Sequence, residues 1–279
     1  MFNLLLAILC SSGVQILMRL STDRVKNNIS MLAVNYAACM LIAAAYTGFG
    51  NLFPQTTGLG TAGILGFLQG LIFLLAFILL QFNDRRNGVV LSASFMKLGL
   101  LVPIAVSIIW FGEKPGIFNA IGFFIAIAAI LLINYDPKKV APAGSRLALL
   151  ALLLVGGFVD VMSKIYQEIG NPDLSAQFLL YTFGGALILS LLLILYKKER
   201  PGKAELLFGI LVAIPNYFSS KFLLAALAEM DAVIMLPCYN VGTIMVATLA
   251  GVLFFRERLQ KHQWIAMGAI LVALVLLNL

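Results

Sequence analysis

Long apolar runs, separated by short polar breaks, are the feature that most limits how this chain can fold. Most runs extend over about 17 to 23 residues, enough for a helix to cross a hydrocarbon layer roughly 30 Å thick. Within hydrocarbon, backbone amides are satisfied only in helices or closed barrels. Barrel strands alternate in polarity, whereas Gly122–Ile133 is apolar at every position. The sequence therefore predicts helices that span a membrane.

The composition leaves little material for a water-soluble domain. Of the 279 residues, 62% are hydrophobic and 11% are charged, about half the charged share of a soluble protein. The net charge of +7 does not indicate nucleic-acid binding, because most cations lie in short breaks between apolar runs, where they orient membrane proteins. Cys10, Cys39 and Cys238 lie inside apolar runs, which predicts small buried side chains rather than disulfides or a metal site.

Turn residues and charges divide the chain into ten segments, and the breaks at Asn83–Gly88, Asp136–Lys139 and Lys197–Gly202 are the clearest. The predicted fold class is an all-α polytopic membrane protein with ten transmembrane helices. The predicted helices are Phe2–Leu20, Ser30–Thr47, Thr61–Phe82, Gly88–Phe111, Phe118–Asn134, Arg146–Tyr166, Leu174–Tyr196, Ala204–Leu227, Ala232–Phe255 and Gln263–Leu279.

The two halves of the sequence resemble each other at a constant offset of about 144 residues, which aligns Phe111-Gly112-Glu113-Lys114 with Phe255-Arg256-Glu257-Arg258. Helices, loops and this charged sequence align together without a gap, which favours duplication over chance similarity. We therefore predict a first repeat over residues 1–136, a linker over 137–145 and a second repeat over 146–279. Because each repeat crosses the membrane five times, an odd number, the second is expected to be inverted relative to the first.

Loop charges predict the orientation of the chain. The odd-numbered loops carry fourteen of the 19 Lys and Arg residues, whereas the even-numbered loops carry one, Lys114, together with several acidic residues. By the positive-inside rule, the odd loops lie in the cytoplasm and both termini lie outside the cell. The expected location is the plasma or inner membrane.

Together these features resemble the drug/metabolite transporter superfamily, specifically its ten-helix members built from two EamA-type domains. The resemblance covers essentially the whole chain. It rests on the duplication, on Glu113 and Glu257 near the ends of the fourth and ninth helices, on Gly122 and on the Ala225–Ala232 link. It implies an exporter or exchanger of metabolites, amino acids or toxic compounds. Family members commonly place both termini in the cytoplasm, opposite to what the charges predict here, and the first helix lacks the family's Trp-Gly-Ser-like start.

Ionisable side chains inside membrane helices are functional candidates, because each costs at least a few kcal/mol to insert. Lys97 lies near the middle of the fourth predicted helix, and Lys221 lies nearer to the end of the eighth. Asp160 and Lys164 lie four residues apart on the sixth helix, so they share one face. This spacing predicts either a local salt bridge or a proton-coupling role for Asp160.

Neutral polar residues cluster after prolines in the eighth and ninth helices. Proline leaves a backbone carbonyl unpaired, so polar side chains beside Pro215 and Pro237 are expected to face the protein interior. Glu113 and Glu257 are expected to form solvated interface pairs. The predicted substrate-binding residues are Lys97, Lys221, Asn216, Tyr217, Asn240, Thr243, Gln15 and Ser94, with Asp160 as the proton-coupling candidate and with no catalytic residue or metal ligand.

Embedded cations outnumber the one embedded carboxylate, Asp160, which favours a solute bearing a carboxylate or phosphate. We expect a secondary transporter of a small anionic or zwitterionic metabolite, such as an amino acid, organic acid or phosphorylated compound, working by alternating access. Proton-coupled efflux of drugs or toxic compounds is an alternative, and a cation channel or carrier is a further one. An enzyme is not expected, because His262 is the one histidine and no HExxH, Gly-x-Ser-x-Gly or Walker motif occurs. The expected partners are the small solute and the lipid bilayer, without cofactor or nucleic acid, in a monomer or homodimer.

Overall fold

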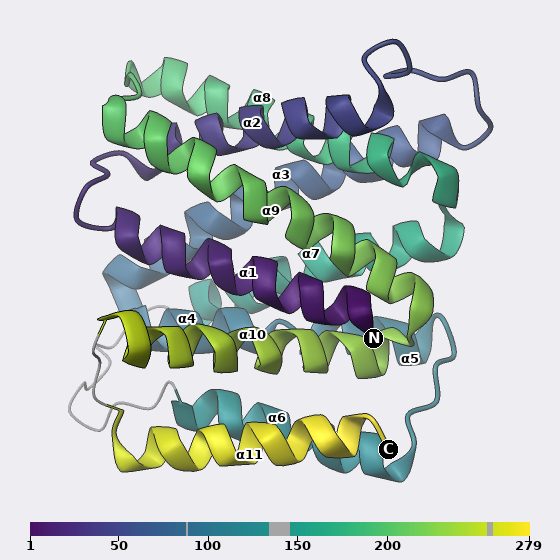
Figure 1. Cartoon of the computed structure of the whole chain (residues 1–279), viewed down its shortest axis with the longest axis vertical. Coiled ribbons are helices and arrows are strands. Elements are labelled where there is room, and N and C mark those ends of the chain that lie inside the picture. The colour runs from purple at the N-terminus through teal and green to yellow at the C-terminus, as the bar shows by residue number, and fades with distance from the viewer. Residues whose placement is uncertain (88, 134–145, 256–258) are drawn as a thin grey trace. The chain divides into compact units, whose positions relative to one another are not determined.

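The computed structural model describes residues 1–87, 89–133, 146–255 and 259–279, and within these ranges it contains helices and no strand. Seven helices are long and apolar enough to cross a membrane, and three shorter apolar segments complete a set of ten. The predicted fold class is thus confirmed. The elements are α1 (Phe2–Ser21), α2 (Asn28–Thr47), α3 (Leu59–Asn87), α4 (Val89–Leu98), α5 (Leu101–Ile109), α6 (Ile117–Ile133), α7 (Arg146–Ile169), the 3₁₀ turn η1 (Pro172–Leu174), α8 (Ser175–Lys197), α9 (Lys203–Glu229), α10 (Ala232–Phe255) and α11 (Lys261–Leu277), as labelled in Figure 1.

The third helix is longer than predicted, because the polar sequence expected to form a break continues α3 through Asn87. The Asn83 amide donates to the carbonyl of Leu79 on the same helix and to that of Ala148 on α7, and the Asn87 amide donates to the Asn83 side chain. Arg85 and Arg86 lie in the last turn, where their positive charges interact favourably with the negative end of the helix dipole. These side chains therefore extend the helix.

The fourth predicted helix is divided into α4 and α5, which is a correction to the single helix Gly88–Phe111. Pro103 cannot donate a hydrogen bond to the carbonyl of Gly99, and its ring would collide with that carbonyl in a regular helix. The backbone instead forms tight turns, in which Gly99 N–H donates to Met96 O and Leu100 N–H donates to Lys97 O. Lys97 consequently lies in the last turn before the break.

The described chain packs as two compact units, and each unit takes helices from both halves of the sequence. Unit 1 comprises Met1–Leu74 and Met162–Ala228, and unit 2 comprises Leu75–Val161 and Glu229–Leu279. The predicted linker 137–145 lies outside the described residues. Helices α1, α3 and α6 begin at Phe2, Leu59 and Ile117, and α7, α9 and α11 begin 144 residues later in each case. The offset seen in the sequence therefore also relates helix starts.

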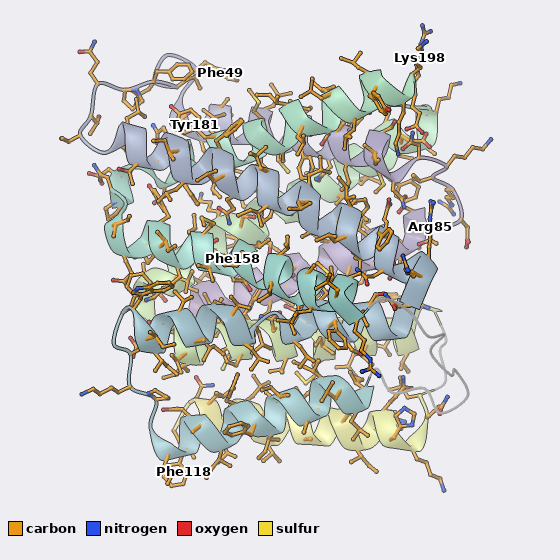
Figure 2. All side chains as sticks on the ribbon, turned by 180° about the vertical axis from the view of Figure 1, so that it is seen from behind. Phe49, Arg85, Phe118, Phe158, Tyr181 and Lys198 are labelled. Atoms are coloured by element: carbon orange, nitrogen blue, oxygen red, sulfur yellow. The ribbon has the colours of Figure 1, made fainter. Side chains whose placement is uncertain are left out.

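In unit 1, α2 packs along α8, its counterpart at this offset, and the two run antiparallel (Figure 1). Asn27, which caps the start of α2, bonds to Glu199 just beyond the end of α8. At the opposite end, Gln177 near the start of α8 donates to the carbonyl of Asn51, beyond the end of α2, at 3.3 Å. Figure 2 shows Tyr181 and Lys198 towards opposite ends of α8. Antiparallel packing of equivalent helices is what an inverted repeat requires.

In unit 2, α6 and α11 form a second antiparallel pair of counterparts (Figure 1). The Asn119 amide donates to Leu277 O at 3.0 Å, and the Gln263 amide donates to Ile133 O at 3.3 Å. Donors and acceptors are both related by the 144-residue offset. The oxygens of these two amides also accept from the N–H groups of Gly116 and Gln260, which precede their own helices. Each side chain thus caps one helix and holds the end of its counterpart.

Glu113 has a different role from the one expected. Its two carboxylate oxygens accept from the N–H groups of Ala232 and Val233 at 3.1 and 2.9 Å, so it caps the start of α10. The first amides of a helix have no partner within the helix, and a carboxylate there also favours the helix dipole. The expectation of a solvated pair with Lys or Arg is corrected for Glu113. Glu257 lies outside the described residues.

Candidate functional site

Three polar residues from three helices of unit 2 interact near the break between α4 and α5. Lys97 lies in the last turn of α4, Asp160 lies in the middle part of α7, and Asn240 lies on α10 one turn after Pro237. The Lys97 ammonium is the charge that acts on the Asp160 carboxylate, and the Asn240 side chain hydrogen-bonds to the same carboxylate. Lys97 and Asp160 are both partly accessible. We call these three residues the Lys97–Asp160–Asn240 group. It combines a cation, an anion and an amide from three different helices.

A close backbone crossing brings together the segments that carry Lys97 and Asp160. A Cβ added at Gly157 would lie 2.3 Å from Gly99 O, and one added at Gly99 would lie 2.9 Å from Gly157 N. Only glycine at both positions allows the backbones of α4 and α7 to come this close. Asp160 lies three residues after Gly157, and Lys97 lies two before Gly99. The crossing therefore sets the separation of the two charged side chains.

The Asn240 amide is anchored on its own helix, since its nitrogen donates to Leu236 O at 3.0 Å. Ser94 lies one turn before Lys97 on α4 and is buried. Thr243 is also buried, and its hydroxyl donates to Tyr239 O at 2.7 Å. Of the predicted substrate-binding residues, Lys97, Ser94, Asn240 and Thr243 thus belong to unit 2, as does Asp160.

The remaining predicted residues, Gln15, Asn216, Tyr217 and Lys221, belong to unit 1. The Asn216 amide donates to the Asn35 side chain at 3.4 Å and to Cys39 Sγ at 3.8 Å. Asn35 is buried, and its amide nitrogen has no hydrogen-bond partner in the described part of the chain. Asn35 is not among the predicted substrate-binding residues, because a lone polar residue in an apolar helix gives no indication of its partner.

Tyr217 and Lys221 lie in an aromatic environment rather than a polar one. Tyr217 is 1% exposed, and its ring packs against those of Tyr46 and Phe183 with centroids 5.6 and 6.1 Å away. The Lys221 ammonium lies 3.7 Å from the centroid of the Tyr46 ring. Tyr46 is exposed and lies in the last turn of α2. A cation over an aromatic ring is stabilised by the ring quadrupole, so Lys221 has a partner at that end of unit 1.

Lys164 pairs with Glu168, four residues along α7, and not with Asp160 as one reading of the sequence expected. Its neighbour Ser163 accepts from the Gln69 amide of α3 at 2.7 Å, and the Thr182 hydroxyl of α8 lies 3.4 Å from the Gln69 oxygen. The backbones are close here, because Gly70 abuts Thr182 O. This network joins α3, α7 and α8 of unit 1 and has a structural role.

These pairings change the charge argument made from the sequence. Lys97 interacts electrostatically with Asp160, Lys164 forms an ion pair with Glu168, and Lys221 lies over Tyr46. Arg19 is exposed near the end of α1. The excess of embedded cations is therefore smaller than residue positions alone indicated.

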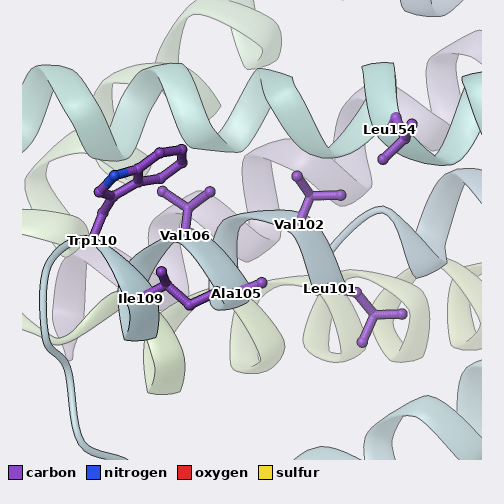
Figure 3. A pocket seen from close by; sticks show the side chains of 7 residues that line it. All are labelled: Leu101, Val102, Ala105, Val106, Ile109, Trp110 and Leu154. Atoms are coloured by element: carbon purple, nitrogen blue, oxygen red, sulfur yellow. The ribbon is translucent and has the colours of Figure 1, made fainter.

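An apolar pocket of about 370 Å³ lies along α5 in unit 2 (Figure 3). Its lining consists of Leu101, Val102, Ala105, Val106, Ile109, Trp110 and, from α7, Leu154. Ile109 and Trp110 are more than three quarters exposed. A surface of this composition suits hydrocarbon, and it offers no charged group for a polar solute. We therefore do not assign the candidate site to this pocket.

Residues 144–279 match the EamA-like transporter family. An uncharacterized protein of Haemophilus influenzae (strain ATCC 51907 / DSM 11121 / KW20 / Rd) is 25% identical over 280 residues, which cover 95% of this chain and 93% of that protein. A crystal structure of a protein with 14% sequence identity covers 99% of this chain and 94% of its own, with a TM-score of 0.77. The last similarity concerns the fold alone.

Proposed function

We propose that this chain is a secondary active transporter of a small anionic or zwitterionic metabolite, of the drug/metabolite transporter type. The proposal is supported by the match of residues 144–279 to the EamA-like transporter family and by the seven helices that are long and apolar enough to cross a membrane. The observation that carries this proposal is the Lys97–Asp160–Asn240 group at the α4–α5 break. The solute is an amino acid, an organic acid or a phosphorylated compound, moved by alternating access.

A helix broken in mid-span supports a transport role, since irregular backbone inside a membrane occurs where it lines a site or is buried in protein. Charged side chains at this depth cost several kcal/mol, and Lys97 and Asp160 are partly accessible. In the proposed site Lys97 binds the carboxylate or phosphate of the solute. Ser94 and the Asn240 amide supply hydrogen bonds, and Asp160 is the proton-coupling group.

The proposed cycle is alternating access, which transporters built from inverted repeats commonly use. The antiparallel α2–α8 and α6–α11 pairs each join a helix of the predicted repeat 1–136 to its counterpart in the predicted repeat 146–279 within one unit, so neither repeat moves as a separate rigid body in this cycle. The proposed location is the plasma or inner membrane, with the odd loops in the cytoplasm.

Flux into proteoliposomes tests the proposal. The purified protein is screened by thermal shift against amino acids, organic acids and sugar phosphates, and the most stabilising compounds are then assayed for counterflow. Lys97→Gln is expected to lower flux at least tenfold while the protein still inserts, because the solute anion loses its counter-ion. Lys198→Gln, at an exposed loop position, is the matched control and is expected to keep full flux. Equal flux through both variants would remove Lys97 from the site.

A further inference from the structure

The apolar pocket along α5, here called the α5 pocket, contains none of the residues of the proposed solute site, and its length indicates what fills it. Its lining extends from Leu101, next to the α4–α5 break, to Trp110, directly after the last residue of α5 (Figure 3). Because α5 has nine residues, the pocket is about 14 Å long at about 1.5 Å per residue. The hydrocarbon layer of a bilayer is about 30 Å thick, so the pocket extends through about one leaflet.

The outer end of the α5 pocket differs in character from its apolar lining. Trp110 lies there and is 78% exposed, and indole rings concentrate at the level of lipid headgroups. Glu113 N–H donates to Ser107 O at 3.1 Å, which folds the following segment back onto the last turn of α5. Both oxygens of Glu113 cap α10. The next residue, Lys114, is exposed and forms no ion pair in the described part of the chain.

A phospholipid has the matching chemistry. Its acyl chain suits a lining without charged groups, and its length within one leaflet suits the length of the pocket. Its phosphate suits Lys114, the one cation of the even-numbered loops, and accepts from the Trp110 indole N–H. A helix of a second copy would continue through both leaflets, and a polar solute would lose its hydrogen bonds along the apolar lining.

We propose that one phospholipid of the bilayer binds to unit 2, with an acyl chain in the α5 pocket and its phosphate at Lys114 and Trp110. The inner end of the chain then packs against Val102 and Leu154. Val102 also borders the α4–α7 crossing, since a Cβ added at Gly157 would lie 2.6 Å from Val102 Cβ. The bound chain therefore fills the space beside this crossing. The proposal does not depend on the solute that the protein transports.

Fluorescence quenching of Trp110 tests the chain. The protein has two tryptophans, so Trp264→Phe leaves Trp110 as the reporter. The full-length variant is reconstituted in phosphatidylcholine that contains, as a minor component, phosphatidylcholine brominated in the upper half of its chains. Ala105→Phe, which fills the α5 pocket, is expected to lose the quenching that exceeds random lipid contact. Ala128→Phe, at an exposed position of α6, is the matched control and is expected to retain it.

A second comparison tests the phosphate. Brominated diacylglycerol carries the same chains as the brominated phospholipid but has no phosphate. In the Trp264→Phe protein, the phospholipid is expected to reach half-maximal quenching at an about fivefold lower mole fraction, the factor expected for one lysine at a membrane surface. Lys114→Gln is expected to remove this preference, because the phosphate loses its counter-ion. Lys198→Gln, also exposed, is expected to keep it.

Three results would overturn the proposal. Equal quenching in Ala105→Phe and Ala128→Phe would mean that Trp110 contacts only the random lipid boundary. Equal potency of phospholipid and diacylglycerol would remove the phosphate contact. Absence of quenching by any brominated lipid would mean that protein covers the α5 pocket. Should Ala105→Phe fail to fold, the phospholipid comparison with and without Lys114→Gln decides, because that variant changes only an exposed loop residue.

Discussion

Gly157 illustrates how the absence of one side chain organises the candidate site. Its α-carbon faces Gly99 O so closely that a Cβ would lie 2.3 Å away, and 2.6 Å from Val102 Cβ. Gly156 precedes it on the same helix, but a Cβ there would meet Met96 at an ordinary 3.5 Å. The two adjacent glycines therefore differ in whether a larger side chain can be accommodated at their positions.

Gly157→Ala is predicted to lower the stability of the detergent-solubilised protein by about 1–3 kcal/mol, the usual cost of overpacking. It also moves Asp160 away from Lys97, so transport falls as well. Gly156→Ala is the control, and it is expected to leave both properties near wild type. Thermal unfolding followed by size-exclusion fluorescence measures the difference. Equal melting temperatures for the two variants would contradict the crossing described above.

The residue types of the candidate site were readable from the sequence, but their partners were not. Lys97, Asp160 and Asn240 stood out because charged and amide groups are rare in membrane helices. Spacing on one helix suggested Lys164 as a partner of Asp160, whereas the structure pairs Lys164 with Glu168. Partners on other helices follow from rotation and packing of each helix, for which residue spacing gives no information.

Among the elements, the α6–α11 pair follows the 144-residue offset down to single hydrogen bonds. Asn119 and Gln263 make equivalent bonds to Leu277 O and Ile133 O at opposite ends of the pair. Helices of 17 residues extend about 25 Å, so the two bonds lie far apart. Groups at such a distance contribute independently to stability.

Asn119→Ala and Gln263→Ala are therefore each predicted to destabilise the protein by about 1–2 kcal/mol, the value of a helix cap and one hydrogen bond. The double variant is expected to lose the sum of the two. Thermal unfolding of the four proteins in one detergent is the measurement. Asn51→Ala serves as control, because the backbone carbonyl of Asn51, not its side chain, accepts the bond from Gln177. A loss in one variant alone would show that the two ends are not equivalent.

Helix ends were the least predictable part of the elements. Asn83–Asn87 has the composition of a loop but continues α3. A hydrogen bond from the Asn83 amide to Ala148 O on α7 stabilises this last turn, and so does the bond from the Asn87 amide to the Asn83 side chain. The α4–α5 break was not predicted within the helix Gly88–Phe111, since an isolated proline in an apolar helix, here Pro103, leaves open whether the helix bends or stops. Glu113 was read as a surface group, and only the approach of α10 gives it two N–H partners.

At the scale of the whole molecule, orientation in the membrane is the property that the charges predict most directly. In unit 1 the first and seventh loops meet, since Glu205 of α9 accepts from Lys26 N at 2.9 Å and Asn27 bonds to Glu199. The second and sixth loops meet at the other end through the Asn171 amide and Thr57 O. The basic loops of this unit thus share one side, as the positive-inside rule requires.

Cysteine labelling tests this orientation. In a variant whose three native cysteines are replaced by alanine, Phe49→Cys is predicted to react with an impermeant maleimide on intact cells. Lys198→Cys is predicted to react only after lysis, because the positive-inside rule predicts that its loop lies in the cytoplasm. Both side chains are exposed at opposite ends of unit 1 (Figure 2). The reverse labelling would place both termini in the cytoplasm and would invert the transport direction relative to the loops.

The sequence by itself determined the membrane class, the ten crossings and the 144-residue relation between the halves. These follow from hydrophobic run length and from the need to satisfy every backbone amide in lipid, which are local properties of the chain. Only the tertiary structure decided that counterparts α2 and α8, and α6 and α11, pack antiparallel, that glycines bring α4 to α7, and that Lys97 is the charge that acts on Asp160. Those features depend on which faces of separate helices meet, and that choice is made by packing across the fold rather than within any one segment.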